Sequence, residues 1–321
     1  MNKLTRILKI VGIPVLFALM LRFVFGVKTM HDLYSVMTIS FLVCLPMGVG
    51  ALTIFFSRIE NVKSLSYRLG APLIPILAFF VITCALAIEG FACWIMVLPF
   101  FLIAASIGGL IAGYFKLKAH KKSERLYVSV ILLLPLFTSP LELMIGAIPG
   151  KYKAYTYIDI HASADKIWSN VTRVKEIEQQ QDKGWLTRTL GFPRPIKAEL
   201  NYDGVGASRE AIFSGGLTFH EKVLSYSDKK KMTFSIKAYP YQIPSTTMDE
   251  HVVIGGDYFD VLDGTYELQK LNDDTYRLNL YSHYKLTTTF NFYASWWAGW
   301  IMKDIQNNIL QVIKQRAEQT G

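Results

Sequence analysis

The C-terminal half of this 321-residue chain contains no cysteine. The three cysteines, Cys44, Cys84 and Cys93, all lie in apolar runs of the N-terminal half. This distribution excludes a disulfide framework and a cysteine-ligated metal site from the C-terminal half. In the N-terminal half, each cysteine is expected to be a small buried apolar residue.

Acidic residues are scarce in the first half of the chain. Residues 1–150 contain 5 Asp/Glu and 13 Lys/Arg, whereas residues 151–321 contain 20 and 21. The formal net charge of +9 therefore belongs almost entirely to the apolar half and its flanks. This pattern does not indicate a nucleic-acid-binding face, and we expect no nucleic-acid partner.

Recognisable catalytic motifs are also missing. The sequence has no nucleophile motif, no glycine-rich phosphate loop and no paired catalytic carboxylates. Gly204–Gly206 follows a predicted strand but leads into another strand, so it is a turn and not a dinucleotide fingerprint. His161, His220, His251 and His283 lack the spacing of a metal site. We therefore expect neither a metal ion nor a cofactor.

Five apolar segments of the N-terminal half are long enough to cross a bilayer, which takes about 20 residues each. They are Ile7–Val27, Leu33–Phe56, Gly70–Ile88, Phe91–Phe115 and Leu126–Gly146. Basic residues concentrate at the N-terminus and after the second and fourth segments, which the positive-inside rule places in the cytoplasm. We therefore expect residues 1–150 to be an integral membrane region of about five spans and residues 151–321 to be an extracytoplasmic domain. A four-span arrangement that fuses or drops one segment is the alternative.

Arg22 and Glu142 are the two charged residues within these segments, and both fall towards the outer leaflet in this topology. A charge in hydrocarbon pairs with an opposite charge or extends its side chain to the headgroup layer. We expect both side chains to extend to that layer. The alternative is an Arg22–Glu142 pair that joins the first and last spans.

The chain changes character at residues 153–170, KAYTYIDIHASADKIWSN. Alternating residues from Tyr155 to His161 predict a half-buried strand. Ser163 then opens a helix whose apolar face includes Ile167, Trp168 and Val171. A strand followed at once by I-x-A-S-A-D-K-I-W resembles the opening of the START-like (SRPBCC) superfamily, the polyketide cyclase/dehydrase and lipid-transport group. The resemblance covers roughly the last half of the chain.

The remainder of that half predicts an antiparallel sheet between two helical regions. The polar stretch Val174–Gly184 predicts a second helix. Strands are expected at Ile196–Tyr202, Ala207–Ser214, Leu217–Ser225, Lys231–Tyr239, Val261–Leu271 and Thr275–Thr288, and a helix at Phe292–Gln319. Turn residues between consecutive strands fix the register, so that Arg209 faces Glu221, Val223 faces Phe234, and Tyr266 faces Leu280. The predicted fold is an α+β helix-grip domain with a curved antiparallel sheet and a long C-terminal helix, for which the resemblance implies a deep apolar cavity.

Arg209 and Glu221 are the strongest candidates for chemistry because both fall on the otherwise apolar inner face. They either orient a ligand's carbonyl, phosphate or carboxylate, or form a structural ion pair. Phe219, Phe234, Tyr266 and Tyr284 are expected to line the cavity. Trp296 and Trp300 are expected in the core, at the cavity mouth or at the lipid interface. The long insertion Pro240–Gly264 is a candidate cover for the cavity.

The predicted function is binding of a hydrophobic or amphipathic small molecule, possibly a lipid, by a domain tethered to the membrane bilayer. An enzyme of cyclase or dehydratase type is the first alternative, with Arg209, Glu221 and either Tyr266 or Tyr284 polarising a carbonyl and moving a proton. A non-catalytic membrane sensor is the second alternative. No feature of the sequence identifies a protein partner.

Overall fold

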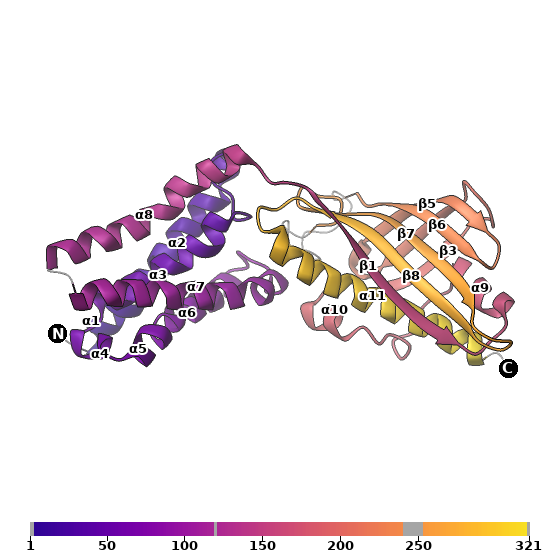
Figure 1. Cartoon of the computed structure of the whole chain (residues 1–321), viewed down its shortest axis with the longest axis horizontal. Helices are drawn as coiled ribbons and strands as arrows, with labels where there is room; N and C mark the ends of the chain where they lie inside the picture. The colour runs from indigo at the N-terminus through magenta and orange to yellow at the C-terminus, as the bar shows by residue number, and fades with distance from the viewer. Residues whose placement is uncertain (1–2, 119–120, 240–252, 320–321) are drawn as a thin grey trace. The chain divides into compact units, whose positions relative to one another are not determined.

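The computed structural model describes residues 3–118, 121–239 and 253–319. The chain divides into two compact units, Met1–Ile148 with Thr288–Phe290, and Pro149–Thr287 with Asn291–Gly321. The first unit is helical and the second combines a sheet with helices (Figure 1).

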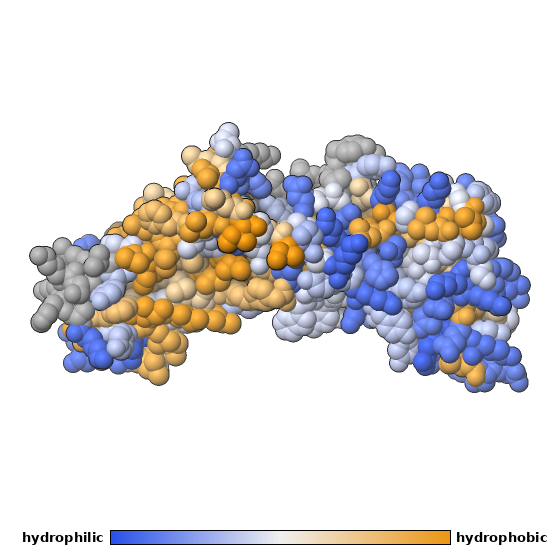
Figure 2. All heavy atoms as spheres, turned by 45° about the horizontal axis from the view of Figure 1, so that its top comes forward, coloured by the Kyte–Doolittle hydropathy of each residue, from blue (hydrophilic) through white to orange (hydrophobic). Residues whose placement is uncertain are grey.

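The first unit carries four helices, within the described residues, that are long and apolar enough to cross a membrane: Leu4–Gly26, Leu65–Ala85, Phe91–Lys118 and Tyr127–Ile145. The second predicted segment is helical only over Ser40–Phe56, which is shorter. Hydrophobic residues cover much of this unit's surface in Figure 2. The elements are α1 (Lys3–Ile7), η1 (Leu8–Gly12), α2 (Ile13–Gly26), η2 (Lys28–Met30), η3 (Ser40–Cys44), α3 (Leu45–Phe56), α4 (Ile59–Val62), α5 (Leu65–Gly70), α6 (Leu73–Ala85), α7 (Phe91–Lys118) and α8 (Lys121–Ile145).

Arg22 and Glu142 do not pair with each other. Arg22 is 8% exposed, forms an ion pair with Glu89, and donates to the carbonyl oxygen of Ile88 at 3.3 Å. Glu142 instead accepts hydrogen bonds from the backbone N–H (2.9 Å) and the hydroxyl (2.6 Å) of Ser40. The expected extension of Arg22 to the headgroup layer and the alternative Arg22–Glu142 pair are therefore both wrong, because each charge has a nearer partner within the protein.

Charged side chains from neighbouring helices meet both ends of the helix formed by η3 and α3. Glu142 of α8 lies at its first residue, Ser40. Lys116 of α7 donates to the carbonyl oxygens of Ile54 (3.1 Å) and Phe55 (2.5 Å) at its last turn. A carboxylate at the N-terminus and an ammonium group at the C-terminus both complement the helix dipole.

Glycines bring α3 and α7 into close contact. A Cβ atom on Gly50 would lie 1.9 Å from the carbonyl oxygen of Ala105, and one on Gly108 would lie 2.1 Å from that of Met47. Any larger residue at either position would have to move backbone atoms. Packing of this kind is typical of helices that associate in a membrane, where small residues let backbones approach.

The second unit is an eight-stranded antiparallel sheet with the order β1-β8-β7-β6-β5-β4-β3-β2, which curls around a long C-terminal helix (Figure 1). This arrangement fits the helix-grip fold. Its elements are β1 (Gly150–Ile160), α9 (Ala164–Thr172), β2 (Arg173–Val174), α10 (Trp185–Leu190), β3 (Pro195–Leu200), β4 (Ser208–Phe213), η4 (Ser214–Gly216), β5 (Thr218–Ser227), β6 (Lys231–Lys237), β7 (Phe259–Lys270), β8 (Tyr276–Leu286) and α11 (Asn291–Gln319).

The predicted strand register is confirmed at three hairpins. Arg209 lies opposite Glu221 between β4 and β5, and Val223 lies opposite Phe234 between β5 and β6. Tyr266 of β7 lies opposite Leu280 of β8. The length of each turn determines which residues of the two strands lie opposite each other. Because side chains alternate between the two faces of a strand, this register also determines which of them point inward.

The predicted second helix lies in the wrong place. Residues 175–184 contain no helix, and α10 begins only at Trp185. The residue that precedes the helix, Gly184, has no side chain to cap it, and Asp304 of α11 supplies the cap instead. The Asp304 carboxylate accepts from the backbone N–H (2.9 Å) and hydroxyl (2.8 Å) of Thr187. A cap from a residue more than 100 positions away leaves no local sequence signal.

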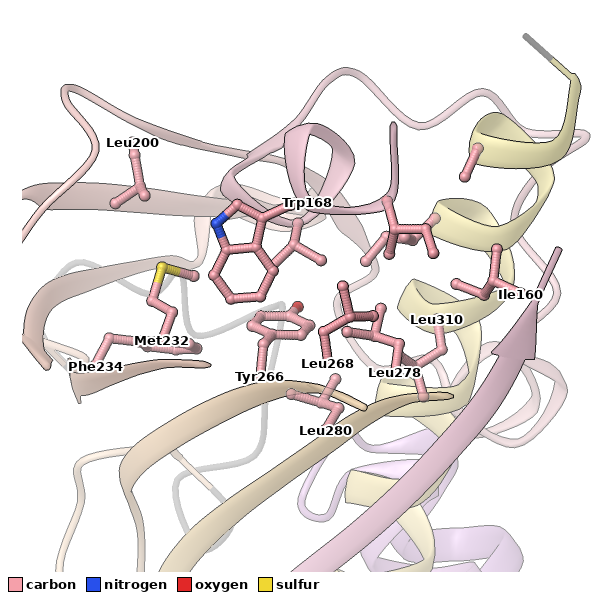
Figure 3. Close-up of a cluster of buried hydrophobic side chains, with 14 of the residues drawn as sticks. Ile160, Trp168, Leu200, Met232, Phe234, Tyr266, Leu268, Leu278, Leu280 and Leu310 are labelled. Atoms are coloured by element: carbon pink, nitrogen blue, oxygen red, sulfur yellow. The ribbon is translucent and has the colours of Figure 1, made fainter. Parts of the chain in front are cut away.

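The main core of the second unit lies between the sheet, α9 and the C-terminal half of α11. Figure 3 shows Trp168 above Tyr266, with Met232 and Phe234 on one side and Leu268, Leu278 and Leu310 on the other. Trp168 is 4% exposed, and its indole N–H donates to the hydroxyl of Tyr226 at 3.0 Å. The interior at this end is filled by side chains of the protein.

Candidate ligand site

Arg209 and Glu221 form a buried ion pair inside the grip. The Arg209 Nε donates to Glu221 Oε2 at 2.5 Å, and each side chain is 5% exposed. A second guanidinium nitrogen, Nη1, donates to the carbonyl oxygen of Val171 at 3.2 Å. The inward direction of both side chains follows from the confirmed pairing of β4 with β5.

Aromatic rings complete the surroundings of Arg209. Its guanidinium carbon lies 4.6 Å from the ring centroid of Phe234 and 5.7 Å from that of Tyr266. These two rings stack with their centroids 6.0 Å apart. Gly264 makes room for Phe234, because a Cβ atom there would lie 2.6 Å from the ring. The arrangement is a cation over two aromatic faces in an otherwise apolar interior.

The electrostatics keep Arg209 charged. Burial by itself would lower the pKa of its guanidinium, but the Glu221 carboxylate and the Tyr266 hydroxyl outweigh this effect and raise that pKa. Burial raises the pKa of the Glu221 carboxyl, against the opposing effect of Arg209. Burial likewise raises the pKa of Tyr266. The cluster thus holds one fixed cation beside two groups that bind a proton more tightly than they would in water.

The other predicted lining residues lie in separate clusters. Phe219 packs edge-on against Phe213 in a second core cluster, with ring centroids 5.0 Å apart. Tyr284 belongs to a third cluster and donates its hydroxyl to the carbonyl oxygen of Ser295 at 3.2 Å. Burial raises the pKa of Tyr284 to about 12. The structure therefore brings together Arg209, Glu221, Phe234 and Tyr266, but not Phe219 or Tyr284.

Trp296 and Trp300 lie on the outside of α11. They are 68% and 49% exposed, and their rings stack with centroids 6.1 Å apart. The expectation that they pack in the core is therefore wrong. The sequence did not show which side of the helix faces the core, because tryptophans occupy more than one side of it. Trp297 lies on a different face from Trp296 and Trp300 and is more buried.

The two halves of α11 differ in how closely they pack. Leu310, Ile313 and Ala317 of the C-terminal half are each 1% exposed. In the N-terminal half, Ile305 is only partly buried, and so is Ile236 of β6, which packs against the same cluster. Both side chains therefore keep some solvent-accessible surface. Sequence reasoning missed both isoleucines because neither is distinguished by type or spacing.

Gln306 marks the division between these two halves. It is 3% exposed and hydrogen bonds to the hydroxyls of Thr156 and Ser282, both at 3.1 Å, and to the carbonyl oxygen of Ala154 at 3.4 Å. These contacts fix the middle of α11 on β1 and β8. A glutamine in an amphipathic helix gives no sequence signal that it is buried.

Two further predictions concern metal binding and the insertion. Among the described residues, no group of three or more His, Cys, Asp or Glu side chains is arranged to hold a metal ion. Most of the insertion predicted to cover the cavity, residues 240–252 with His251, lies outside the described residues.

No family model and no curated protein matches this chain. Solved structures resemble part of it. Norcoclaurine synthase from Thalictrum flavum, in complex with dopamine and hydroxybenzaldehyde, is 14% identical over 55% of this chain and 91% of its own, with a TM-score of 0.33. The Zhui aromatase/cyclase from Streptomyces sp. R1128 is 14% identical over 53% and 95%, with a TM-score of 0.34. A START superfamily protein from Mycobacterium smegmatis is 10% identical over 54% and 100%, with a TM-score of 0.35. The ligands and reactions in these names are properties of those proteins.

Proposed function

We propose that this chain binds a hydrophobic or amphipathic small molecule inside the grip, at the end near the start of α11, while its first unit anchors it in a membrane. The observation that carries the proposal is the partial burial of Ile236 and Ile305 on the interior side of the grip. Apolar side chains left accessible inside a concave fold gain free energy when an apolar ligand covers them.

The Arg209–Glu221 pair supplies the polar end of this site. Glu221 lies directly opposite Ile236 in the sheet, so the charged pair borders the loosely packed region. The guanidinium donates to Glu221 and to the carbonyl oxygen of Val171, and it carries five N–H groups in all. A ligand with an apolar body and a carbonyl or carboxylate end would complement this combination.

Replacement of Ile305 by tryptophan tests the site by filling it. The full-length chain is purified in dodecyl maltoside, incubated with oleate as the probe, and analysed by native mass spectrometry. We expect the wild type to retain one oleate and Ile305→Trp to retain none, with an unchanged unfolding temperature. Leu224→Trp, on the exposed surface of β5, is the control for an added indole and should retain oleate.

Ile313→Trp provides the matched control for packing, because it lies two turns further along α11 in the closed core. An added indole there should overpack the interior and cost about 1–3 kcal/mol of stability. Equal destabilisation by Ile305→Trp and Ile313→Trp, together with no oleate on the wild type, would show a filled interior and end the proposal.

The enzyme alternative is favoured by one observation, the raised pKa of Glu221 beside Tyr266 and Arg209. A carboxyl with a raised pKa is suited to proton transfer. Compounds extracted from the purified wild type and from Glu221→Gln would then differ in mass, by one water for a dehydratase. Glu210→Gln, on the outer face of β4, is the control. Identical compounds from all three proteins would exclude this alternative.

We also propose that the second unit is extracytoplasmic. The support is the concentration of basic residues at the N-terminus and in alternate loops of the first unit. Alkaline phosphatase fused after Gly321 folds only outside the cytoplasm and should be active, whereas a cytoplasmic reporter at the same position should not. An inactive phosphatase together with an active cytoplasmic reporter would place the second unit in the cytoplasm, and this topology would require four spans.

A further inference from the structure

The start of α11 presents a stripe of exposed tryptophan. Trp296 and Trp300 are four residues apart and therefore share one face of the helix. The rings are stacked, with planes inclined by 8°. The next exposed residues on this face are Lys303 and Asn307, so the aromatic stripe is confined to the first turns. Large apolar surface that faces water in a soluble domain marks an interaction site.

The stripe lies at one particular end of the sheet. β1 begins at Gly150, which pairs with Leu286 at the end of β8, and α11 begins five residues later at Asn291. Only four residues separate Gly150 from the last apolar helix, Tyr127–Ile145. The five steps from Ile145 to Gly150 reach at most about 18 Å when fully extended. If that helix crosses a bilayer, the same end of the sheet is tethered close to the bilayer surface.

The charges at this end suit a lipid surface. Lys151 of β1 lies directly opposite Lys285 of β8, on the face of the sheet that points away from α11, since Tyr152 and Tyr284 beside them pack against that helix. Asp260 on β7 faces Lys285 from the other side, while Lys151 is exposed at the edge strand. Lys303 adds a further positive charge beside the tryptophans. Tryptophan concentrates at the headgroup depth of bilayers, and lysine pairs there with anionic headgroups.

We propose that the first turns of α11 lie in the headgroup layer of an anionic membrane, with Trp296 and Trp300 inserted and Lys303 beside the lipid phosphates. This contact is independent of the ligand site, since the stripe faces away from Ile305 and the interior. It would hold the loosely packed end of the grip at the lipid surface.

Fluorescence quenching by lipid tests the proposal on the full-length chain. The protein is reconstituted in vesicles of phosphatidylcholine and phosphatidylglycerol that carry bromine atoms high on the acyl chains. We expect bromolipid to quench the wild type, and the double variant Trp296→Ala/Trp300→Ala to lose most of this quenching. Trp185→Ala is the matched control because Trp185 is 63% exposed elsewhere in the same unit, and its removal should leave the quenching unchanged.

Acrylamide, a quencher confined to water, separates the remaining outcomes. If acrylamide quenches Trp296 and Trp300 and bromolipid does not, the two side chains face water, which overturns the proposal. Tryptophans shielded from both quenchers are covered by protein, either the first unit or a second copy of the chain, and this result also overturns it. Neither outcome bears on oleate binding at Ile305, so the two proposals fail separately.

Discussion

Removal of one member of the Arg209–Glu221 pair should cost far more stability than removal of both. Arg209→Met leaves the Glu221 carboxylate without its partner in an interior where that side chain is 5% exposed. The double variant Arg209→Met/Glu221→Leu replaces both charges by apolar groups of similar size. Comparison of Arg209→Met, Glu221→Leu and the double variant isolates the energy of coupling between the two residues.

The magnitudes follow from the burial of the pair. Loss of one partner of a buried ion pair costs about 3–5 kcal/mol, whereas an apolar replacement of both is about neutral or stabilising by roughly 1–4 kcal/mol. The single variant should also depend on pH. Burial already raises the pKa of Glu221 in the wild type, and loss of Arg209 removes the opposing effect and raises it further. The variant is therefore most stable below the unfolded pKa and loses more stability than the wild type as pH rises through the folded pKa.

Hydrogen exchange of the full-length chain, detected by mass spectrometry, reports this effect specifically in peptides from β4 and β5. A cost of 3–5 kcal/mol corresponds to a loss of protection of about two to four powers of ten. The double variant should regain the wild-type protection. A single variant that loses less than about tenfold, or a double variant that stays as weak as the single one, would refute the view that desolvation governs this pair.

Three other substitutions give direct tests. Between pH 10 and 12, the wild type should lose up to about 2–3 kcal/mol of folding stability, because the pKa of Tyr284 in the folded state, about 12, exceeds the unfolded value. Tyr284→Phe should not show this loss, and an equal loss in both proteins would contradict the reasoning. Gly50→Ala should destabilise the first unit by about 1–3 kcal/mol in thermal unfolding, since its Cβ meets the Ala105 carbonyl, whereas Gly70→Ala, with open space, should not. Glu142→Gln should cost about 1–2 kcal/mol and speed hydrogen exchange at the start of η3, and unchanged exchange would argue against capping.

The fold of the second unit could be predicted from local patterns because its hairpins are joined by short turns. Gly215 and Gly216 both adopt positive φ, and this turn aligns Arg209 with Glu221. Since side chains alternate between the two faces of each strand, this register is enough to determine which of them point inward. Interactions between distant segments were not predictable in this way. The cap that Asp304 provides to α10 comes from more than 100 residues later in the chain.

The candidate site was predictable only in part, for the same reason. Arg209, Glu221, Phe234 and Tyr266 share neighbouring strands, so register was enough to bring them together. The packing of α11 depends on which face of a long helix meets the sheet, and Trp296, Trp297 and Trp300 made that face ambiguous. In the first unit, Glu89 lies in the short interval between two helices, where no periodicity predicts its contact with Arg22.

The hydrogen bonds of Gln306 restrict how α11 can move on the sheet. A helix held at its midpoint to β1 and β8 cannot slide along the sheet or separate from it as one body without breaking three buried hydrogen bonds. The half beyond Gln306 is further locked by Leu310 and Ile313. A displacement of the first four turns of α11 alone would leave these bonds intact and would break the hydrogen bonds of Ser295 with Tyr284 and of Asp304 with Thr187.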